Sequence, residues 1–267
     1  MQRLLITGGC GYLGGELVRR APARGWDVRA TWFERPPQGE AKWVQADLRD
    51  AGAARHAVAG VDAVIHTAYR QGAGEWEVNV EGSAAVAAAA EGLRLVHLSS
   101  DVVFDGTRGR YREEDAPAPV NSYGRSKAEA ERRVAELHGD ATIVRTSLIY
   151  GGVEPGPQER LAAEGVRFFV DEIRSPVHVG DLADALLEVV SMPLAGMLHL
   201  GGADDLSRFE FAVLLGADPA RIEEAHTTPE RAPDVSLDSL RAASLLRTRL
   251  RGAHEVLESS SDVRRAR

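Results

Sequence analysis

A tyrosine and a lysine at positions 123 and 127 have the spacing of a pair that can move a proton. Residues at i and i+4 share one helix face, so the Lys127 ammonium can stabilise the phenolate of Tyr123. Without a nearby cation, a phenol has a pKa of about 10 and exchanges protons poorly at neutral pH. Ser100 adds a hydroxyl that can hydrogen-bond a carbonyl oxygen. The set fits carbonyl reduction or its reverse, with a nicotinamide as hydride carrier.

The tyrosine–lysine spacing has a second interpretation when it is taken alone. Lys127 can equally pair with Glu131 on a solvated helix face, where such an ion pair has little consequence. The chemical interpretation is favoured because Ser100 and a glycine-rich segment occur in the same chain.

The glycine-rich segment lies between the first expected strand and the first expected helix. It reads Gly8-Gly9-Cys10-Gly11-Tyr12-Leu13-Gly14. Gly8 permits a tight turn, Gly11 lets the backbone approach a pyrophosphate, and Gly14 lets the helix pack closely on the strand. An ordinary glycine-rich turn is the alternative, but the position favours a dinucleotide site. Cys10 is expected to be a small buried residue.

The residues that follow the second and third expected strands indicate which cofactor the protein binds. Glu34 can bind the ribose hydroxyls of NAD(H), whereas Arg35 can pair with the 2′-phosphate of NADP(H). We favour NADP(H) over NAD(H) because of Arg35. Asp47 can accept a hydrogen bond from the adenine amino group or cap the following helix. Further cofactor contacts are expected from Tyr12, Leu13, Leu48, Ala68, Tyr69, Asn79, Ser99, Tyr123 and Lys127.

Alternating apolar runs and alanine-rich stretches predict the elements that position these residues. Strands are expected at 3–7, 28–32, 43–45, 63–67, 93–99 and 142–146, and helices at 14–24, 51–58, 76–91 and 123–137. Several of the strands are apolar throughout, as strands buried on both faces are. The pattern predicts an α/β fold with a Rossmann-like, doubly wound parallel sheet.

The composition changes after Tyr150. Residues 151–157 are rich in Gly and Pro, and shorter elements follow at 168–170, 181–190 and 197–200. We therefore expect an NADP-binding Rossmann domain over residues 1–150. A smaller substrate-binding lobe, interleaved with it, is expected over 151–255, and a disordered tail over 256–267.

Composition and charge disfavour several classes of function. The 267 residues are 44% hydrophobic, which suffices for a core, and 32 basic against 40 acidic residues give a net charge of −8. Such a charge disfavours nucleic-acid binding. No apolar run approaches the roughly 20 residues of a membrane span. One cysteine and no recognisable signal peptide suggest the cytoplasm. The eight histidines lack metal-binding spacing, so no metal is expected, and His66 and His97 are expected to be hydrogen-bonded core residues.

Several segments between Thr7 and Gly202 together resemble a known family. They are residues 7–14, 79–82, 98–106, 121–127, 145–151, 175–183 and 198–202. On these motifs the chain resembles the extended short-chain dehydrogenase/reductases, and more narrowly the dTDP-4-dehydrorhamnose reductase family. The resemblance covers the chain to about Leu250. It implies a Rossmann domain with a small C-terminal lobe for a nucleotide-activated sugar, and catalytic roles for Ser100, Asp101, Tyr123 and Lys127.

Two aromatic positions of that family are aliphatic in this sequence. Val102 and Leu148 stand where the family has a tyrosine and often a tryptophan suited to the sugar nucleotide, and the loop over 66–76 is shorter. Val102 and Leu148 are expected to contact the substrate, and Arg174 is expected to bind the diphosphate of the substrate. The small or apolar faces of residues 82–91 and 125–137 allow a homodimer.

The resemblance predicts an NADPH-dependent reductase of a nucleotide-linked 4-keto-6-deoxy sugar. Three alternatives stay open. They are a reductase or dehydrogenase of another carbonyl compound in secondary metabolism, a sugar-nucleotide epimerase that holds NAD, and a non-catalytic NADP-binding module similar to the regulatory subunit of methionine adenosyltransferase.

Overall fold

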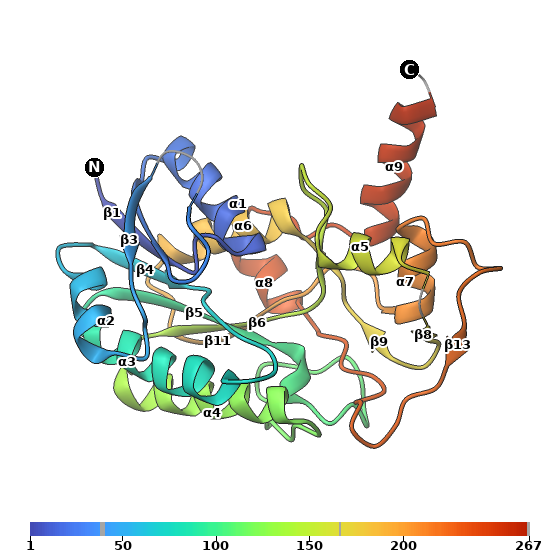
Figure 1. The fold of residues 1–267 in the computed structure, drawn as a ribbon, viewed down its shortest axis with the longest axis horizontal. Coiled ribbons are helices and arrows are strands. Elements are labelled where there is room, and N and C mark those ends of the chain that lie inside the picture. The colour runs from blue at the N-terminus through green and yellow to red at the C-terminus, as the bar shows by residue number, and fades with distance from the viewer. Residues whose placement is uncertain (38–40, 166, 266–267) are drawn as a thin grey trace. The chain divides into compact units, whose positions relative to one another are not determined.

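The computed structural model describes residues 1–37, 41–165 and 167–265, and the chain forms two compact units. Unit 1 comprises Met1–Ser100, Ser122–Val144 and Ala183–Leu198, whereas unit 2 comprises Asp101–Asn121, Arg145–Leu182 and His199–Arg267. Each unit therefore draws on segments that are far apart in the sequence. Figure 1 labels the elements along the chain.

A seven-stranded sheet in the order β11-β6-β5-β4-β1-β2-β3 forms the centre of the fold. Its strands are β1 (Arg3–Thr7), β2 (Asp27–Trp32), β3 (Lys42–Gln45), β4 (Ala63–His66), β5 (Arg94–Ser100), β6 (Thr142–Thr146) and β11 (Gly196–Leu200). Strand β1 pairs in parallel with β2 and β4, β2 with β3, and β4 with β5. The six strands predicted in the first half of the chain are confirmed, each within one residue.

Helices cover both faces of this sheet. They are α1 (Tyr12–Arg20), α2 (Ala51–Val58), α3 (Gly82–Ala89), α4 (Ser122–Leu137) and α6 (Val179–Val190). In Figure 1, α2, α3 and α4 lie on one side of the sheet, and α1 and α6 on the other. Arg20 at the end of α1 donates to Asp184 of α6 at 2.7 Å. The predicted doubly wound α/β fold is confirmed.

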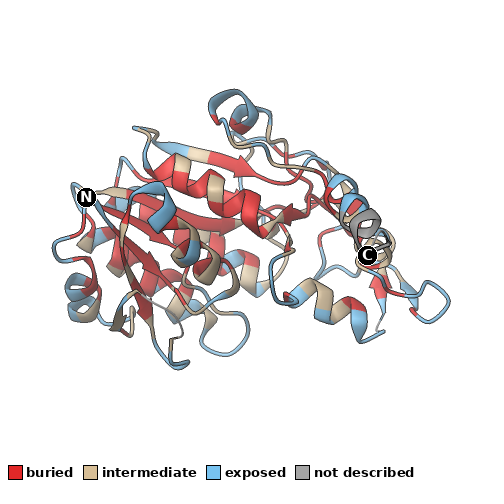
Figure 2. Cartoon of the chain, turned by 90° about the horizontal axis from the view of Figure 1, so that it is seen from above, coloured by how far each residue is buried: buried red, intermediate tan, exposed pale blue. Residues whose placement is uncertain are grey.

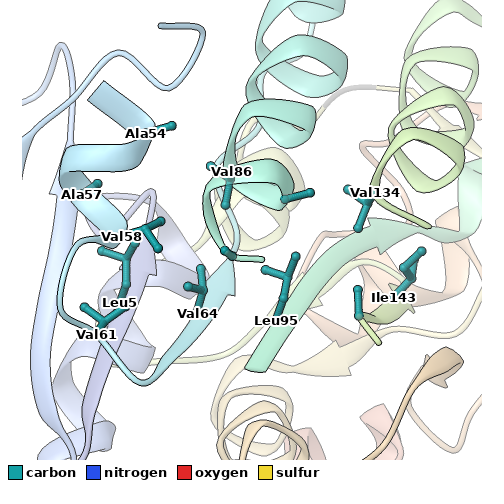
Figure 3. Close-up of a cluster of buried hydrophobic side chains, with 13 residues drawn as sticks. Leu5, Ala54, Ala57, Val58, Val61, Val64, Val86, Leu95, Val134 and Ile143 are labelled. Atoms are coloured by element: carbon teal, nitrogen blue, oxygen red, sulfur yellow. The ribbon is translucent and has the colours of Figure 1, made fainter. Parts of the chain in front are cut away.

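An apolar cluster fixes α2, α3 and α4 to the sheet (Figure 3). Leu5, Val64, Leu95 and Ile143 come from four strands and pack against Ala54, Val58, Val86 and Val134 of the three helices. All of them are nearly or completely buried, and the strands of the sheet are largely buried in Figure 2. Burial of this kind contributes about 1.5–3 kcal/mol for each large side chain. The position of α4 on β5 therefore depends on apolar packing.

Two of the predicted helices differ from the observed ones. The helix expected over 14–24 starts earlier as α1 and ends in a 3₁₀ turn, η1 (Ala21–Arg24), which has a proline near its start. The helix expected over 76–91 begins with a π-helical turn, η2 (Glu77–Glu81), before α3. π-Helical turns are rare and are frequent at functional sites.

Unit 2 is assembled from short elements. Its strand pairs are β7 (Ile149–Tyr150) with β10 (Val177–His178), β9 (Ile173–Arg174) with β12 (Leu206–Ser207), and β8 (Phe168–Phe169) with β13 (Glu224–Ala225). Its helical elements are η3 (Asp101–Val103), α5 (Pro157–Ala163), α7 (Arg208–Leu214), α8 (Leu240–Leu245) and α9 (Ala253–Arg265). Tyr150, Phe211 and Val256 belong to one of its apolar clusters.

The domain boundary expected at residue 150 does not coincide with the two units. Residues 101–121 group with unit 2 because their backbone bonds to its later segments, with Tyr111 N donating to Ser236 O at 2.8 Å. The tail expected to be disordered from residue 256 is instead helical to Arg265. Burial of Val256 beside Tyr150 stabilises the start of this helix, and residues 266–267 lie outside the described residues.

Candidate functional site

The glycine-rich segment lies where the strand order reverses. The chain continues from β1 to β2 on one side, and β4 flanks β1 on the other, so the loops after β1 and β4 diverge at this point. Dinucleotides bind in such crevices. Thr67 Oγ1 donates to Thr7 O at 2.7 Å, which joins the two loops. Gly8 has a φ of +66°, and its N–H donates to Thr31 Oγ1 at 3.1 Å.

The backbone is closely packed at Gly8 and Gly14 and open at Gly11, as a pyrophosphate-binding turn requires. A Cβ on Gly8 would lie 2.9 Å from the Ala68 Cα, and one on Gly14 would lie 2.1 Å from the Gly8 oxygen. At Gly11, only the Gly8 oxygen comes within 4 Å, at 3.1 Å, so this backbone borders open space. Helix α1 starts at Tyr12 with no side-chain cap and no acidic residue in its first turn. The first turn of α1 therefore brings no carboxylate of its own to compete with a bound anion.

The charged residues after β2 lie close to this segment. Burial raises the pKa of the Cys10 thiol, and the positive charge of Arg35 opposes that shift, which places Arg35 near the glycines. The carboxylate of Glu34 accepts from Arg70 at 2.6 Å in an exposed ion pair. The acidic candidate for a ribose contact is thus partly neutralised, whereas the charge of Arg35 is near enough to act on Cys10 in the glycine-rich segment.

Asp47 does not cap the helix that follows it. The cap of α2 is Asp50, whose carboxylate accepts from Ala53 N at 2.7 Å. Asp47 instead binds the guanidinium of Arg49, which lowers the pKa of its carboxyl. One of the two interpretations of Asp47 is therefore excluded, and the adenine contact stays a prediction. Leu48 packs against the apolar cluster beneath.

The side chain of Lys127 connects α4 to the strand that ends at Ser100. Lys127 is 3% exposed, and its Nζ donates to Leu98 O at 2.7 Å. Burial lowers the pKa of Lys127 to about 8, and the negative charge of Glu131 opposes this shift. Tyr123 lies one turn earlier on α4, and Ser100 is the last residue of β5. The structure thus brings the elements that carry the three residues together.

Two histidines near Lys127 are uncharged. His66 and His97 stack at 5.3 Å between ring centroids. Burial and the charge of Lys127 lower the pKa of both, that of His66 to about 3. His66 bonds to Thr7 and Ser83, as expected of a core histidine. For His97 that expectation is wrong, because neither ring nitrogen has a hydrogen-bond partner among the residues that the structure describes.

Asn79 is fully buried and bonded within the protein. Its Oδ1 accepts from Arg70 N, and its Nδ2 donates to Arg70 O and to Ser126 Oγ, each at 2.9 Å. Tyr69 is 56% exposed, with its ring 6.2 Å from that of Tyr123. Ser99 is buried, and its hydroxyl has no hydrogen-bond partner within the described part of the chain. Ser126 received no role from the sequence, although it lies within the tyrosine–lysine motif.

In unit 2, Asp101 and Arg174 bind each other. Arg174 Nε donates to Asp101 Oδ2 at 2.8 Å, its Nη2 donates to Oδ1, and its Nη1 donates to Glu172 at 3.3 Å. Both partners are buried. The ion pair engages the carboxylate expected to act in catalysis and much of the guanidinium expected to bind a diphosphate. Val102, in η3, is half-buried, and Leu148 packs against the cluster around Tyr150.

Two further arginines lie with this ion pair. Arg208 donates to the amide oxygen of Gln158 at 2.8 Å, and burial together with Arg174 lowers the pKa of Arg208 to about 10. Arg231 lies 3.4 Å from Glu172 and over the Phe169 ring. We call Asp101, Glu172, Arg174, Arg208 and Arg231 the arginine cluster; its three cations exceed its two carboxylates by one charge. Of its members, the sequence predicted a role for Asp101 and Arg174, and gave no signal for the other three.

No group of three or more His, Cys, Asp or Glu residues suited to a metal ion occurs in the described part of the chain. Across the same residues, no helix has the length and apolar character needed to cross a membrane.

Comparison with known proteins shows which family the chain belongs to. The model of the RmlD substrate binding domain matches residues 1–250. The chain belongs to this family. It is 33% identical over 288 aligned positions to dTDP-4-dehydrorhamnose reductase of Mycolicibacterium smegmatis, covering 97% of this chain and 85% of the relative. It is 30% identical over 259 positions to methionine adenosyltransferase 2 subunit beta of Bos taurus, covering 85% and 75%.

A solved structure with NADP has the same fold. It is the dTDP-4-dehydrorhamnose reductase of Bacillus anthracis in complex with NADP, which matches with a TM-score of 0.82 at 25% identity over 97% of this chain and 98% of that one. The resemblance stated from the motifs is thereby confirmed.

The two adjacent glycines of α1 make a matched pair for testing the glycine-rich segment. Gly14→Ala should lower the free energy of unfolding by about 1–3 kcal/mol, because its methyl group would overlap the Gly8 oxygen. Gly15→Ala should raise it by about 0.5–1 kcal/mol, since a Cβ there meets nothing closer than 3.6 Å. Urea unfolding of both variants measures the difference. Equal effects would contradict the described packing.

The stability of the wild type relative to Lys127→Met should depend on pH. A lysine whose folded pKa is about 8 has lost its proton at pH values where the unfolded chain, at 10.5, still holds one. The unfolded state then binds more protons, so the wild type should gain up to about 1.4 kcal/mol per pH unit over the variant between pH 8 and 10. Urea unfolding at pH 7, 8 and 9.5 tests this. A constant difference would mean that Lys127 is not buried as a charge.

Proposed function

We propose that the protein is an NADP(H)-dependent reductase of the 4-keto group of a nucleotide-linked 6-deoxy sugar. The observation that carries this proposal is the buried Lys127 ammonium, which is bonded to the strand ending at Ser100 and lies one helical turn from Tyr123. Membership of the family and a relative named dTDP-4-dehydrorhamnose reductase support the class of substrate.

The residues around the glycine-rich segment fit the cofactor. The open backbone at Gly11 and the start of α1 suit the pyrophosphate, and Arg35 suits the 2′-phosphate. Asp47 and Leu48 are assigned to the adenosine end, and Tyr69 and Ser99 to the nicotinamide end. When bound, NADPH supplies the hydride that reduces the carbonyl carbon.

Side chains of unit 1 donate the proton and stabilise the group that loses it. Tyr123 Oη donates a proton to the carbonyl oxygen as that oxygen gains negative charge. Lys127 stabilises the phenolate that is left, and its burial strengthens this attraction because few water dipoles screen it. The Ser100 hydroxyl donates a hydrogen bond to the same substrate oxygen and holds it in place.

The arginine cluster supplies the charge for a sugar nucleotide. Arg174 is engaged by Asp101, so we assign the diphosphate primarily to Arg208 and Arg231, with Arg174 completing the positive field. Asp101 then acts by holding Arg174, and not by moving a proton. Val102 and Leu148 are assigned to the sugar, where their smaller side chains leave more room than aromatic ones.

A non-catalytic NADP-binding subunit is the second candidate. It is favoured by the 30% identity to methionine adenosyltransferase 2 subunit beta. The two candidates differ in turnover, because a regulatory subunit can bind NADPH without oxidising it.

The test of the proposed reaction is NADPH oxidation with dTDP-4-dehydrorhamnose by the wild type and by Tyr123→Phe. The wild type should turn over, and the variant should lose about 100-fold or more in kcat, because it lacks the proton donor. NADPH affinity should stay within about twofold, since the phosphate-binding residues are unchanged. If the wild type binds NADPH without oxidising it, the non-catalytic subunit is favoured. If Tyr123→Phe turns over at a near-normal rate, the role of Tyr123 is contradicted.

Arg35→Ala tests the choice of cofactor. The variant should bind NADPH at least about 10-fold more weakly and NADH almost unchanged, because only NADPH carries the 2′-phosphate that the guanidinium pairs with. Fluorescence titration with both cofactors measures this, with Arg24→Ala, which removes an exposed arginine elsewhere in unit 1, as the control. An equal loss for both cofactors would contradict the assignment.

A further inference from the structure

A buried amide connects two loops of unit 1 with the catalytic helix. Asn79 binds both backbone groups of Arg70 and also donates to Ser126 Oγ, each at 2.9 Å. Both hydrogens of its amide nitrogen are therefore used inside the protein, and one position on its oxygen is used as well. A bound cofactor would have to break these bonds to use the amide as a donor.

The π-helical turn puts Asn79 in this place. Asn79 is the central residue of η2, which directly precedes α3 and is followed by ordinary α-helix. A π turn inserts an extra residue and changes the direction of the side chains around it. The turn thereby directs a polar side chain into the interior, and Asn79 is completely buried there.

The second member of the connection, Ser126, lies between the two catalytic residues of α4. It is completely buried, and its Oγ donates to Tyr123 O at 2.8 Å while it accepts from Asn79. A buried serine with both a donor and an acceptor in place restricts the rotation of its hydroxyl. The connection therefore reaches the turn of α4 that carries Tyr123 and Lys127.

The other end of the connection is the dipeptide Tyr69–Arg70. The Tyr69 ring lies 6.2 Å from the Tyr123 ring, and the Arg70 side chain pairs with Glu34 after β2. Because Asn79 binds both the N–H and the carbonyl of Arg70, the dipeptide is fixed in the manner of a strand pairing. One amide side chain thus sets the position of an exposed aromatic ring beside the proton donor.

We propose that Asn79 and Ser126 are positioning residues that together hold the Tyr69–Arg70 dipeptide against the turn of α4 bearing Tyr123. We call these hydrogen bonds the amide clamp. Its expected effect on turnover rests on the proposed function, whereas its effect on the loop and on NADPH binding does not.

The test uses Asn79→Asp, Ser126→Ala and the double variant, with Ser191→Ala as matched control. Asn79→Asp keeps the size and the acceptor for Arg70 N–H but removes both donors. Ser191, which directly follows α6 in unit 1, likewise donates to a backbone carbonyl one turn earlier, Leu187 O, at 3.0 Å, so Ser191→Ala reports the effect of losing an ordinary serine-to-backbone bond. Three quantities are measured on the full chain: amide hydrogen exchange of residues 67–72, the Kd of NADPH, and kcat and KM with dTDP-4-dehydrorhamnose.

The clamp predicts that both single variants increase exchange of residues 67–72 by about 10-fold or more, while Ser191→Ala leaves it unchanged. It predicts that kcat falls about 10-fold while KM stays within about twofold, because the position of the proton donor Tyr123 is disturbed more than substrate binding. The double variant should match Asn79→Asp within about twofold, since both changes remove the same bond.

Different results would overturn the clamp. Unchanged exchange in Ser126→Ala, or effects that multiply in the double variant, would show that the two residues act independently. A loss of NADPH affinity confined to Asn79→Asp, with Ser126→Ala like the wild type, would make Asn79 a direct cofactor contact. If the wild type fails to reduce the sugar nucleotide, the proposed function fails, and exchange and NADPH affinity still decide the clamp.

Discussion

The packing of α4 against β5 depends on accommodating a buried lysine side chain, Lys127. Removing such an ion from water costs several kcal/mol unless it is hydrogen-bonded and paired. Leu98 O and the negative charge of Glu131 provide this compensation, while the stacked histidines nearby are neutral. Because Leu98 belongs to the strand that ends at Ser100, the bond that stabilises the charge also fixes α4 to that strand. The apolar cluster beneath α4 supplies the free energy that keeps this charge buried.

The two units contribute different kinds of positive potential. Unit 1 offers backbone N–H groups at the start of a helix, the guanidinium of Arg35 and the Lys127 ammonium. Unit 2 offers the arginine cluster, in which two carboxylates organise three guanidinium groups and leave one positive charge in excess. In the proposed function, the groups of unit 1 are assigned to the dinucleotide and those of unit 2 to the sugar nucleotide, which are both polyanions. The net charge of −8 for the whole chain hides these local concentrations of positive charge.

The sequence predicted the parts of the molecule that depend on local pattern. Six strands, the glycine-rich segment and the spacing of Tyr123 and Lys127 could be read because periodicity and i, i+4 geometry are local. The interactions that were missed join distant residues: Asn79 and Ser126 are 47 positions apart, and Asp101 and Arg174 are 73. The helical end of the chain was missed for the same reason, since Val256 is buried against residues from distant segments.

The central claim is that the protein carries out hydride transfer to a sugar carbonyl, and not only cofactor binding. Incubation of dTDP-4-dehydrorhamnose with NADPH that carries deuterium at both positions on C4 of the nicotinamide, followed by mass spectrometry and NMR of the product, tests it most directly. The account predicts one deuterium on the former carbonyl carbon for each NADPH oxidised. NADPH that binds but is not oxidised, or a product that forms without deuterium, would contradict it.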